Sequence, residues 1–481
     1  MSAPPVHHRQ RVLTTVVAGT GISVVDASAA TVALPTIAAW YGADLPTVQW
    51  IMTGNLLAVA ALLVPMGRLG DLVGRKRLFV VGFALFAAAS VAAALSPGIG
   101  VLISARIMAG IGASMAQANG IPIALNHYGE DRRGYVLGIQ MGVVGLGGIT
   151  GPALGGFITS FINWQSIFWV TAAGTLLVCL AAQLVFRATG QRDPQAARRF
   201  DWWGALLSAG FLVALLAALT SGPRVGWSHP GFWTGLILAA CLLVAFIVWE
   251  KRCRHPMLEL SMFASPLFSL GVLASVAHFM SMSSVRFLVP FHLTAVEKLS
   301  PAQVGLALVP AAVVIATVGP FAGRLSDFWG ARRVANLGMI VTAGGLMVLL
   351  GLNPDAGTGP VIGALMLMAL GGAVFHAPNS SSIMGALDQQ RLGVAAGFIS
   401  LSRNAGNVIG VALTAALVSA TMARRGLPPV LDPAASDTPT LEAFDQGAQV
   451  VITVLLVILL TVLLSILWTL SRKSAPTGSA R

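Results

Sequence analysis

Charged side chains are scarce in this chain of 481 residues. Asp, Glu, Lys and Arg make up 10% of it, against about 25% in ordinary soluble domains. Hydrophobic residues make up 56%, and the mean hydropathy is +0.82. So few charges cannot cover the surface of a water-soluble globule, and a disordered chain has the opposite composition. The composition therefore indicates a protein whose solvent is the lipid bilayer.

Features of disulfide-rich, ATP-driven and metal-dependent proteins are missing as well. The three cysteines, Cys179, Cys241 and Cys253, are too few for a disulfide framework and are expected to pack. No G-x-x-x-x-G-K-[ST] loop occurs, so we expect an ion gradient, not ATP, to supply energy. We predict no cofactor and no metal. A nucleophile–base or His–Asp pair at one membrane face would indicate a membrane enzyme, and none is evident.

Fourteen apolar segments are long enough for the roughly 20-residue helix that crosses a bilayer. Strand alternation is absent, so helices are the predicted structure. The predicted spans are 13–38, 48–68, 78–95, 100–124, 135–160, 166–187, 203–221, 231–249, 267–292, 302–321, 333–351, 359–382, 392–419 and 447–470.

The basic residues predict the orientation. An even number of spans places both tails, 1–12 and 471–481, on one side. If that side is the cytoplasm, 22 Lys and Arg residues lie there and four lie outside, as positive-inside membrane proteins require. The excess of basic residues therefore indicates membrane topology, not nucleic-acid binding. We predict a multi-pass protein of the cytoplasmic (inner) membrane. Three arginines, Arg106, Arg286 and Arg403, fall inside spans.

An internal repeat divides the chain. The segment Gly67–Arg77 recurs as Gly323–Arg333, with Gly, Arg, Leu, Asp, Gly and a basic pair shared. Homologous halves are typical of secondary transporters. The eight-span offset between the copies predicts two six-helix bundles, 13–187 and 267–470, separated by a linker, 188–266, that contains two additional central helices.

Four motifs carry a resemblance to the major facilitator superfamily, and within it to the fourteen-span drug/proton antiporter branch. They are the loop motif Gly67–Arg77, the first-span segment Asp26–Pro35, the fourth-span segment Leu102–Gly112, and the Gly-Pro motif Gly147–Gly156. The fourth-span segment departs from the family pattern at Ala109, where glutamine is usual. The resemblance implies a non-enzymatic, monomeric carrier with the major facilitator fold, which exchanges protons for a small molecule by alternating access.

Asp26 is the acid nearest the middle of a span; the other sixteen lie in loops or near helix ends. An unpaired mid-helix Asp costs about 2.5–3.5 kcal/mol on insertion scales, so it calls for an explanation. Burial raises a carboxyl pKa, which allows a proton and a cationic substrate to compete for one charge. Asp26 is therefore the predicted coupling residue. The competing interpretation is a structural ion pair with Arg106 or Arg403.

Other polar side chains interrupt the spans. The resemblance gives Arg106 a part in proton transfer, although snorkelling to the outer surface also explains its position. His376 is an alternative proton relay, because histidine binds a proton near neutral pH. Arg403 is expected to line the substrate cavity and to contribute to coupling. Further candidates for cavity lining, for which a hydrogen-bonded helix contact is the alternative, are Arg286, Asn379, Asn404 and Asn407.

The loop motif and its copy predict tight hairpins. Glycine permits close turning, and Asp71 can lie at a helix N-terminus of the opposite half, where an anion is favoured. The resemblance implies a gate that holds the cytoplasmic side shut in the outward-open state. The predicted gate residues are Gly67, Asp71, Gly74, Arg75 and Arg77, with Gly323, Asp327 and Gly330 in the copy.

The fifth span is unusually poor in side-chain bulk. Gly147, Gly151, Gly155 and Gly156 leave room for close packing, and Pro152 favours a kink. We therefore predict a helix that bends during transport, with ordinary small-residue packing as the alternative.

The substrate charge remains open between two predictions. A single mid-membrane acid suits amphipathic, cationic drugs or toxic compounds, so drug export and antibiotic resistance are the first prediction. Three intramembrane arginines would better suit an anion. The alternative is therefore export of one specific metabolite, such as a siderophore, an amino acid or an anionic compound.

Overall fold

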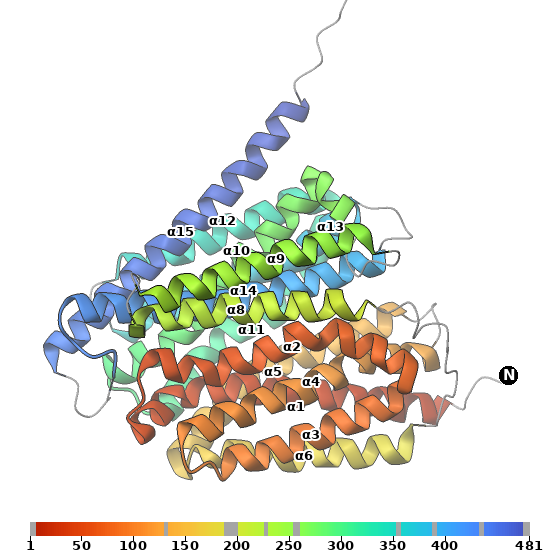
Figure 1. The fold of residues 1–481 in the computed structure, drawn as a ribbon, viewed down its shortest axis with the longest axis horizontal. Helices are drawn as coiled ribbons and strands as arrows, with labels where there is room; N and C mark the ends of the chain where they lie inside the picture. The colour runs from red at the N-terminus through yellow and green to blue at the C-terminus, as the bar shows by residue number, and fades with distance from the viewer. Residues whose placement is uncertain are drawn as a thin grey trace, which may run out of the picture.

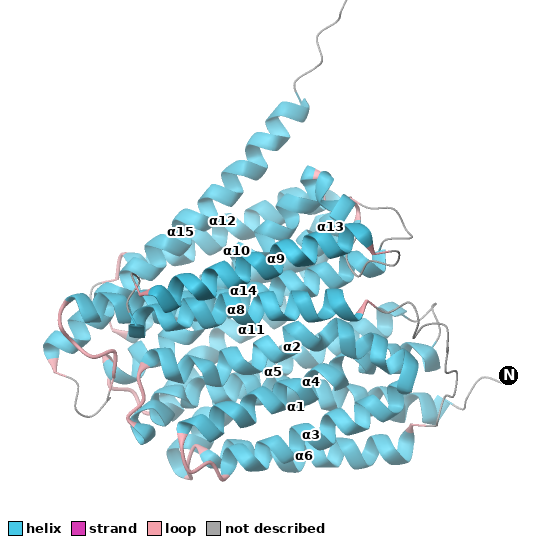
Figure 2. Ribbon diagram, in the orientation of Figure 1, coloured by secondary structure: helices cyan, strands magenta, loops and turns pink. Residues whose placement is uncertain are grey.

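The computed structural model describes residues 6–128, 133–186, 201–225, 229–253, 260–352, 357–386, 392–431 and 437–474. In these ranges the chain forms long α-helices and one short 3-10 helix, η2 (Leu260–Ala264), and no strand (Figure 2). The helices are α1 (Val6–Tyr41), α2 (Leu45–Val73), α3 (Arg75–Ala94), α4 (Ile99–Tyr128), α5 (Arg133–Phe161), α6 (Gln165–Val185), α8 (Trp202–Val225), α9 (Pro230–Arg252), α10 (Pro266–Ala295), α11 (Pro301–Trp329), α12 (Ala331–Leu350), α13 (Thr358–Met384), α14 (Leu392–Arg424) and α15 (Thr438–Ser474).

The all-helical membrane fold predicted from hydropathy is confirmed. Thirteen helices within the described ranges are long and apolar enough to cross a membrane. The remaining predicted span, 203–221, lies in α8, whose stretch Trp202–Leu215 is apolar but shorter. The first helix begins at Val6, seven residues before the predicted span, because no proline or glycine interrupts the helix there.

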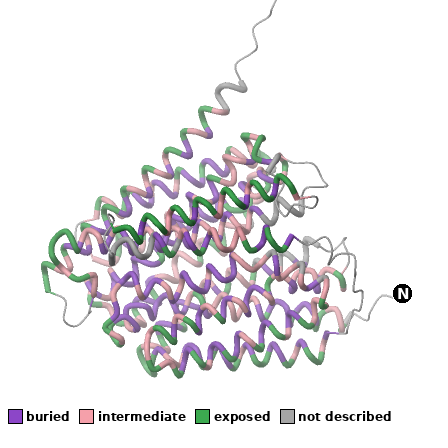
Figure 3. Tube along the Cα trace, in the orientation of Figure 1, coloured by how far each residue is buried: buried purple, intermediate pink, exposed green. Residues whose placement is uncertain are grey.

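The helices form two groups that lie side by side (Figure 1). Helices α1–α6 make up the N-terminal half, and α10–α15 make up the C-terminal half. The additional pair, α8 and α9, packs along the boundary, since α8 contacts both α2 and α14. Leu57, Leu212 and Val408 form one apolar cluster there, with one residue from each of these three helices. Most of α9 is exposed, as expected of a lipid-facing helix (Figure 3).

The duplicated loop folds in the same way in both halves. One glycine, Gly74 or Gly330, separates two helices, and its φ is 108° or 85°. The Gly74 amide donates to the Gly70 carbonyl at 3.0 Å, and the Gly330 amide donates to the Ser326 carbonyl at 3.0 Å. Only glycine adopts such φ values without strain. The repeated sequence therefore encodes a repeated turn.

The two halves touch at one end of the molecule. We call the end where α1 begins and α15 ends the terminal end, and the opposite end the distal end. A large apolar cluster joins both halves in the distal region, including Ala33 of α1 and Phe291 of α10. Two backbone amides also cross between the halves there: Leu45 N donates to the Pro429 carbonyl at 3.0 Å, and Ala302 N donates to Ser160 Oγ at 2.8 Å.

The described apolar clusters near the terminal end each stay within one half. The cluster around Val12 and Phe186 contains only residues of α1–α6. The cluster of Ala322, Val334 and Val374 belongs to α11–α13. The structure is therefore closed at the distal end, and among the described residues the halves share no such cluster at the terminal end.

We expect Gly74→Ala to lower the free energy of unfolding by about 1–3 kcal/mol, because alanine is strained at this φ. Thermal unfolding of the detergent-purified protein measures the loss. Gly100→Ala is the matched control, since Gly100 is an exposed glycine of α4 with no atom near an added Cβ. Equal melting temperatures for both variants would contradict the strain argument.

Candidate functional site

Asp26 and Arg106 form a buried ion pair inside the N-terminal half. Arg106 Nη1 lies 2.8 Å from Asp26 Oδ2, and the two side chains are 3% and 2% exposed. The pair joins α1 to α4. The structure shows the ion pair that was the competing interpretation of Asp26, and it excludes the snorkelling interpretation of Arg106 in this conformation. The coupling role of Asp26 stays a prediction.

Side chains from two further helices complete this site. Thr171 of α6 donates a hydrogen bond to Asp26 Oδ1 at 3.1 Å. The Arg106 guanidinium lies over the Phe168 ring, 5.4 Å from its centroid, which is a cation–π distance. Asn55 of α2 donates to the Arg106 carbonyl at 3.1 Å. Arg106 Nε has no hydrogen-bond partner among the described residues, so the arginine is held mainly by its single acid.

Thr171, Phe168 and Asn55 were not among the residues predicted from the sequence. Threonine, phenylalanine and asparagine occur in many membrane helices as packing residues, so nothing in the local pattern singles them out. Their role follows only from the packing of α2 and α6 against α1 and α4.

The C-terminal half carries a group of basic side chains with a different environment. Arg286 of α10 and His376 of α13 are exposed, and Arg403 of α14 is half-buried. Phe279 of α10 lies between His376 and α14, because its ring contacts His376 and a Cβ at Gly406, three residues after Arg403, would meet it. Helices α10 and α14 also pack against α1 and α2 of the N-terminal half, so we take these exposed side chains to face the internal space between the halves. The cavity lining expected of Arg286 and Arg403 stays a prediction.

Aromatic rings pack around His376. Its ring contacts Phe279 edge-on, with centroids 4.3 Å apart. Behind it, His278 is fully buried and stacks on Phe375 at 4.3 Å. Neither ring nitrogen of His278 has a hydrogen-bond partner among the described residues. The histidine pair therefore connects the internal space to the core of the C-terminal half.

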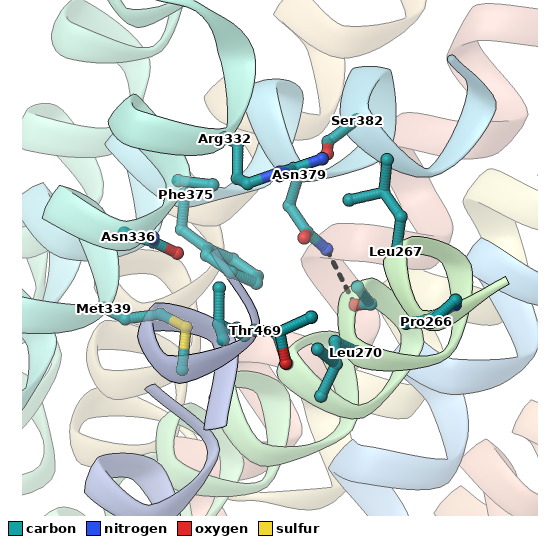
Figure 4. Close-up of a pocket in the computed structure, with 14 residues that line it drawn as sticks. Pro266, Leu267, Leu270, Arg332, Asn336, Met339, Phe375, Asn379, Ser382 and Thr469 are labelled. Atoms are coloured by element: carbon teal, nitrogen blue, oxygen red, sulfur yellow. Dashed lines mark hydrogen bonds between the residues drawn. The ribbon is translucent and has the colours of Figure 1, made fainter. Parts of the chain in front are cut away.

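The three predicted asparagines occupy different positions. Asn379 Nδ2 donates to the Gly271 carbonyl at 3.1 Å and to Ser275 Oγ at 2.8 Å. It lines a separate cavity of about 40 Å³ within the C-terminal half, together with Arg332 (Figure 4). The structure thus favours the helix-contact interpretation for Asn379. Asn404 is buried and Asn407 is half-buried.

The glycines of the fifth-span motif pack α5 against two helices. A Cβ at Gly147, Gly151 or Gly155 would meet α1. A Cβ at Gly156 would instead meet the backbone of α11 at Pro301, across the boundary between the halves. Pro152 lies inside a helix that continues from Arg133 to Phe161. The predicted bending stays a prediction, while the close packing is observed.

The structure describes only some of the predicted gate side chains. The backbones of Asp71 and Asp327 lie in the last turns of α2 and α11, but their side chains are outside the described part of the chain. Gly67 and Gly323 lie one turn earlier, and Arg77 is exposed. The gating role of this loop, including that of Arg75, stays a prediction.

Two polar contacts were missed by sequence reasoning. Lys76 Nζ donates to the Gln183 carbonyl at 2.9 Å, at the C-terminus of α6, where a cation is favoured. Near the distal end, His292 Nδ1 lies 3.2 Å from Asp445 Oδ1, and both side chains are under 20% exposed. A His–Asp pair at one membrane face therefore exists, although 153 residues separate its members in the sequence.

A family model described as the Major Facilitator Superfamily matches residues 16–277 and 271–480. The chain belongs to the major facilitator superfamily. Among superfamily members, the riboflavin transporter RibZ of Clostridioides difficile is 30% identical over 405 residues, which cover 83% of this chain and 86% of RibZ. The multidrug resistance protein Stp of Mycobacterium tuberculosis is 29% identical, covering 89% of this chain and 80% of Stp. The tetracenomycin C resistance and export protein of Streptomyces glaucescens is 28% identical, with 85% and 75% covered.

Solved superfamily structures share the fold. A bacterial homologue of the human lysosomal transporter Spinster, in an inward-facing and unoccupied conformation, aligns with a TM-score of 0.70 at 17% identity, over 97% of each chain. A peptide transporter in complex with sulfate aligns with a TM-score of 0.69 at 17% identity, over 96% of this chain and 95% of that one. The fold and the family are therefore established, and the fourteen-span branch stays a prediction.

The buried pair predicts a stability effect in this superfamily member. Arg106→Met should lower the free energy of unfolding by about 3–5 kcal/mol, because it leaves Asp26 charged and unpaired in a low-dielectric site. The double variant Asp26→Asn/Arg106→Met removes both charges and should recover most of the loss. Melting temperatures in detergent rank the variants. A double variant less stable than Arg106→Met would contradict the ion pair.

Proposed function

We propose that the protein is a proton-coupled exporter of amphipathic organic compounds, in which the Asp26–Arg106 pair couples proton movement to alternating access. The observation that carries this proposal is the pair itself. It is a fully buried ion pair inside a membrane bundle, and the helix that carries Asp26, α1, contacts α10 and α11 of the other half. Relatives named as resistance and export proteins support the direction of transport.

The pair has the chemistry that exchange requires. The Asp26 carboxylate can hold either the Arg106 guanidinium or a proton, and protonation removes the charge that keeps Arg106 in place. Because Asp26 is 2% exposed in this conformation, a proton reaches it only after the helices around it rearrange. Proton binding and the change of conformation are thereby linked.

The proposed mechanism also requires the closed distal end to open during export. In this proposal, the conformation described here is the one whose substrate space faces the terminal end, which the distribution of basic residues predicts to be cytoplasmic. Export requires the contacts between α5 and α11 to separate. The small residues at this contact, including Gly156 and Gly305, let the two backbones meet and part without interlocking side chains.

The pairing of Asp26 bears on the choice between a cationic and an anionic substrate. The preference for cationic drugs rested on an acid free to receive a cation, and Asp26 is paired in this state. Arg286 and Arg403 instead have no carboxylate partner among the described residues. This observation favours the alternative of an anionic compound, while the superfamily and the exporter proposal are unaffected.

A disulfide across the distal contact tests alternating access. In a background without Cys179, Cys241 and Cys253, we expect Ser160→Cys/Ala302→Cys to stop transport when oxidised and to recover it on reduction. The two positions are close enough to be joined, because the Ala302 amide lies 2.8 Å from Ser160 Oγ. Dye efflux from cells measures the rate, and the single-cysteine variants are the controls. An oxidised double variant at full rate would exclude separation at this contact.

The coupling role has its own test. The Asp26→Asn variant should reach the membrane in normal amount, but its rate of uphill export should fall by at least about tenfold. The asparagine amide cannot bind and release a proton as the carboxylate does. Export of anionic and cationic amphipathic dyes into everted vesicles, driven by a pH gradient, measures this loss. The control is Asp437→Asn, at an exposed carboxylate before α15. Undiminished uphill export would remove Asp26 from the mechanism.

A further inference from the structure

Three basic side chains of the C-terminal half lie on three helices that pack together. Arg286, His376 and Arg403 come from α10, α13 and α14. Phe279 of α10 connects these helices, since its ring contacts His376 and its Cβ faces Gly406, three residues after Arg403. At a rise of about 1.5 Å per residue, Arg403 lies about 16 Å into α14 from its terminal-end start, whereas Arg286 lies about 30 Å into α10. The group therefore extends in depth along the internal space.

Nothing in the described protein neutralises these arginines. Neither guanidinium makes a hydrogen bond or an ion pair with a described side chain, although most intramembrane charges are paired. Asp26, the acid nearest mid-membrane, is already occupied by Arg106 and Thr171. The remaining acids lie in loops or near helix ends. The internal space thus has an excess of positive charge that the described residues do not balance.

The wall beside these charges is aromatic. Phe279 is half-buried and contacts His376 at 4.3 Å. Phe279 and Arg286 are seven residues apart on α10, which places them on the same helix face two turns apart. A ligand held by the arginines therefore also meets an apolar ring surface.

We propose that this space binds an organic anion with an aromatic or apolar body, its acidic group held first by Arg403 and then, deeper in the space, by Arg286, and its body against Phe279 and His376. This inference names the substrate class of the exporter proposed above and so rests on that function. An anion entering from the terminal end meets Arg403 and His376 first and Arg286 deeper in the space. The substrate supplies the negative charge that the protein lacks, which gives specificity against cations by like-charge repulsion.

A matched pair of dyes tests the charge preference by binding, independently of transport. Fluorescein is anionic and rhodamine 123 is cationic, and both have an aryl-xanthene body. Fluorescence anisotropy with the purified full chain should give a fluorescein Kd at least about tenfold below that of rhodamine 123. Arg286→Gln and Arg403→Gln should each raise the fluorescein Kd by about tenfold, since each removes a charge-assisted contact.

Controls separate this site from a general charge effect. Arg424→Gln removes an exposed arginine at the distal end of α14 and should leave the fluorescein Kd unchanged. Arg286→Lys keeps the charge and should retain most of the binding. Melting temperatures within a few degrees of the parent protein confirm that the variants are folded.

Several outcomes would overturn the proposal. A fluorescein Kd no lower than the rhodamine 123 Kd excludes an anion site on these arginines. A fluorescein Kd that is unchanged in both Arg286→Gln and Arg403→Gln excludes it as well. Displacement of fluorescein by phosphatidylglycerol but not by phosphatidylcholine would assign the site to a lipid headgroup in place of a soluble anion. Arginine-dependent binding without export would support the anion site and count against the exporter function alone.

Discussion

A charge inside a bilayer must be neutralised or solvated, and the two halves of this protein meet that requirement differently. The N-terminal half neutralises its charges internally, because Asp26 and Arg106 are paired at 2.8 Å and nearly inaccessible. In the C-terminal half, Arg286 and Arg403 have no acid partner among the described residues. The first arrangement suits the proposed proton-dependent switch, and the second suits the proposed ligand site.

The two halves differ in their charges although they share a duplicated arrangement of helices and turns. The repeated loop folds into the same turn in both halves, at Gly74 and Gly330. The contact between the halves uses small residues, with Gly156 of α5 against the backbone of α11. Such a contact relies on close backbone approach more than on interlocking side chains, so it suits an interface that opens and closes. In the proposed mechanism, the duplicated helices move, and the charges that are not duplicated distinguish the two halves.

Hydropathy and the repeat predicted the spans and the duplicated turn because both depend on local patterns. Partner choice was not predictable in the same way. Pairing of Asp26 with Arg106, 80 residues away, was one of two interpretations left open, because a span pattern does not show which face meets α4. Asn379 was a cavity candidate by residue type, but its amide is used within the C-terminal half. His292 and Asp445 were missed for the same reason. Helix rotation and packing decide these contacts, and they depend on the whole bundle.

The two proposals together have an electrical consequence. If one proton enters for each monovalent anion that leaves, positive charge moves inward and negative charge moves outward, so two charges are transferred in the same sense. Each charge is worth about 2.3 kcal/mol per 100 mV of membrane potential. An interior-negative potential then drives both movements, and a pH gradient adds to it. Exchange of a proton for a monovalent cation would instead be electrically silent and would depend on the pH gradient. If both proposals hold, the unpaired arginines of the C-terminal half determine, through the charge of the substrate, which component of the proton-motive force drives export.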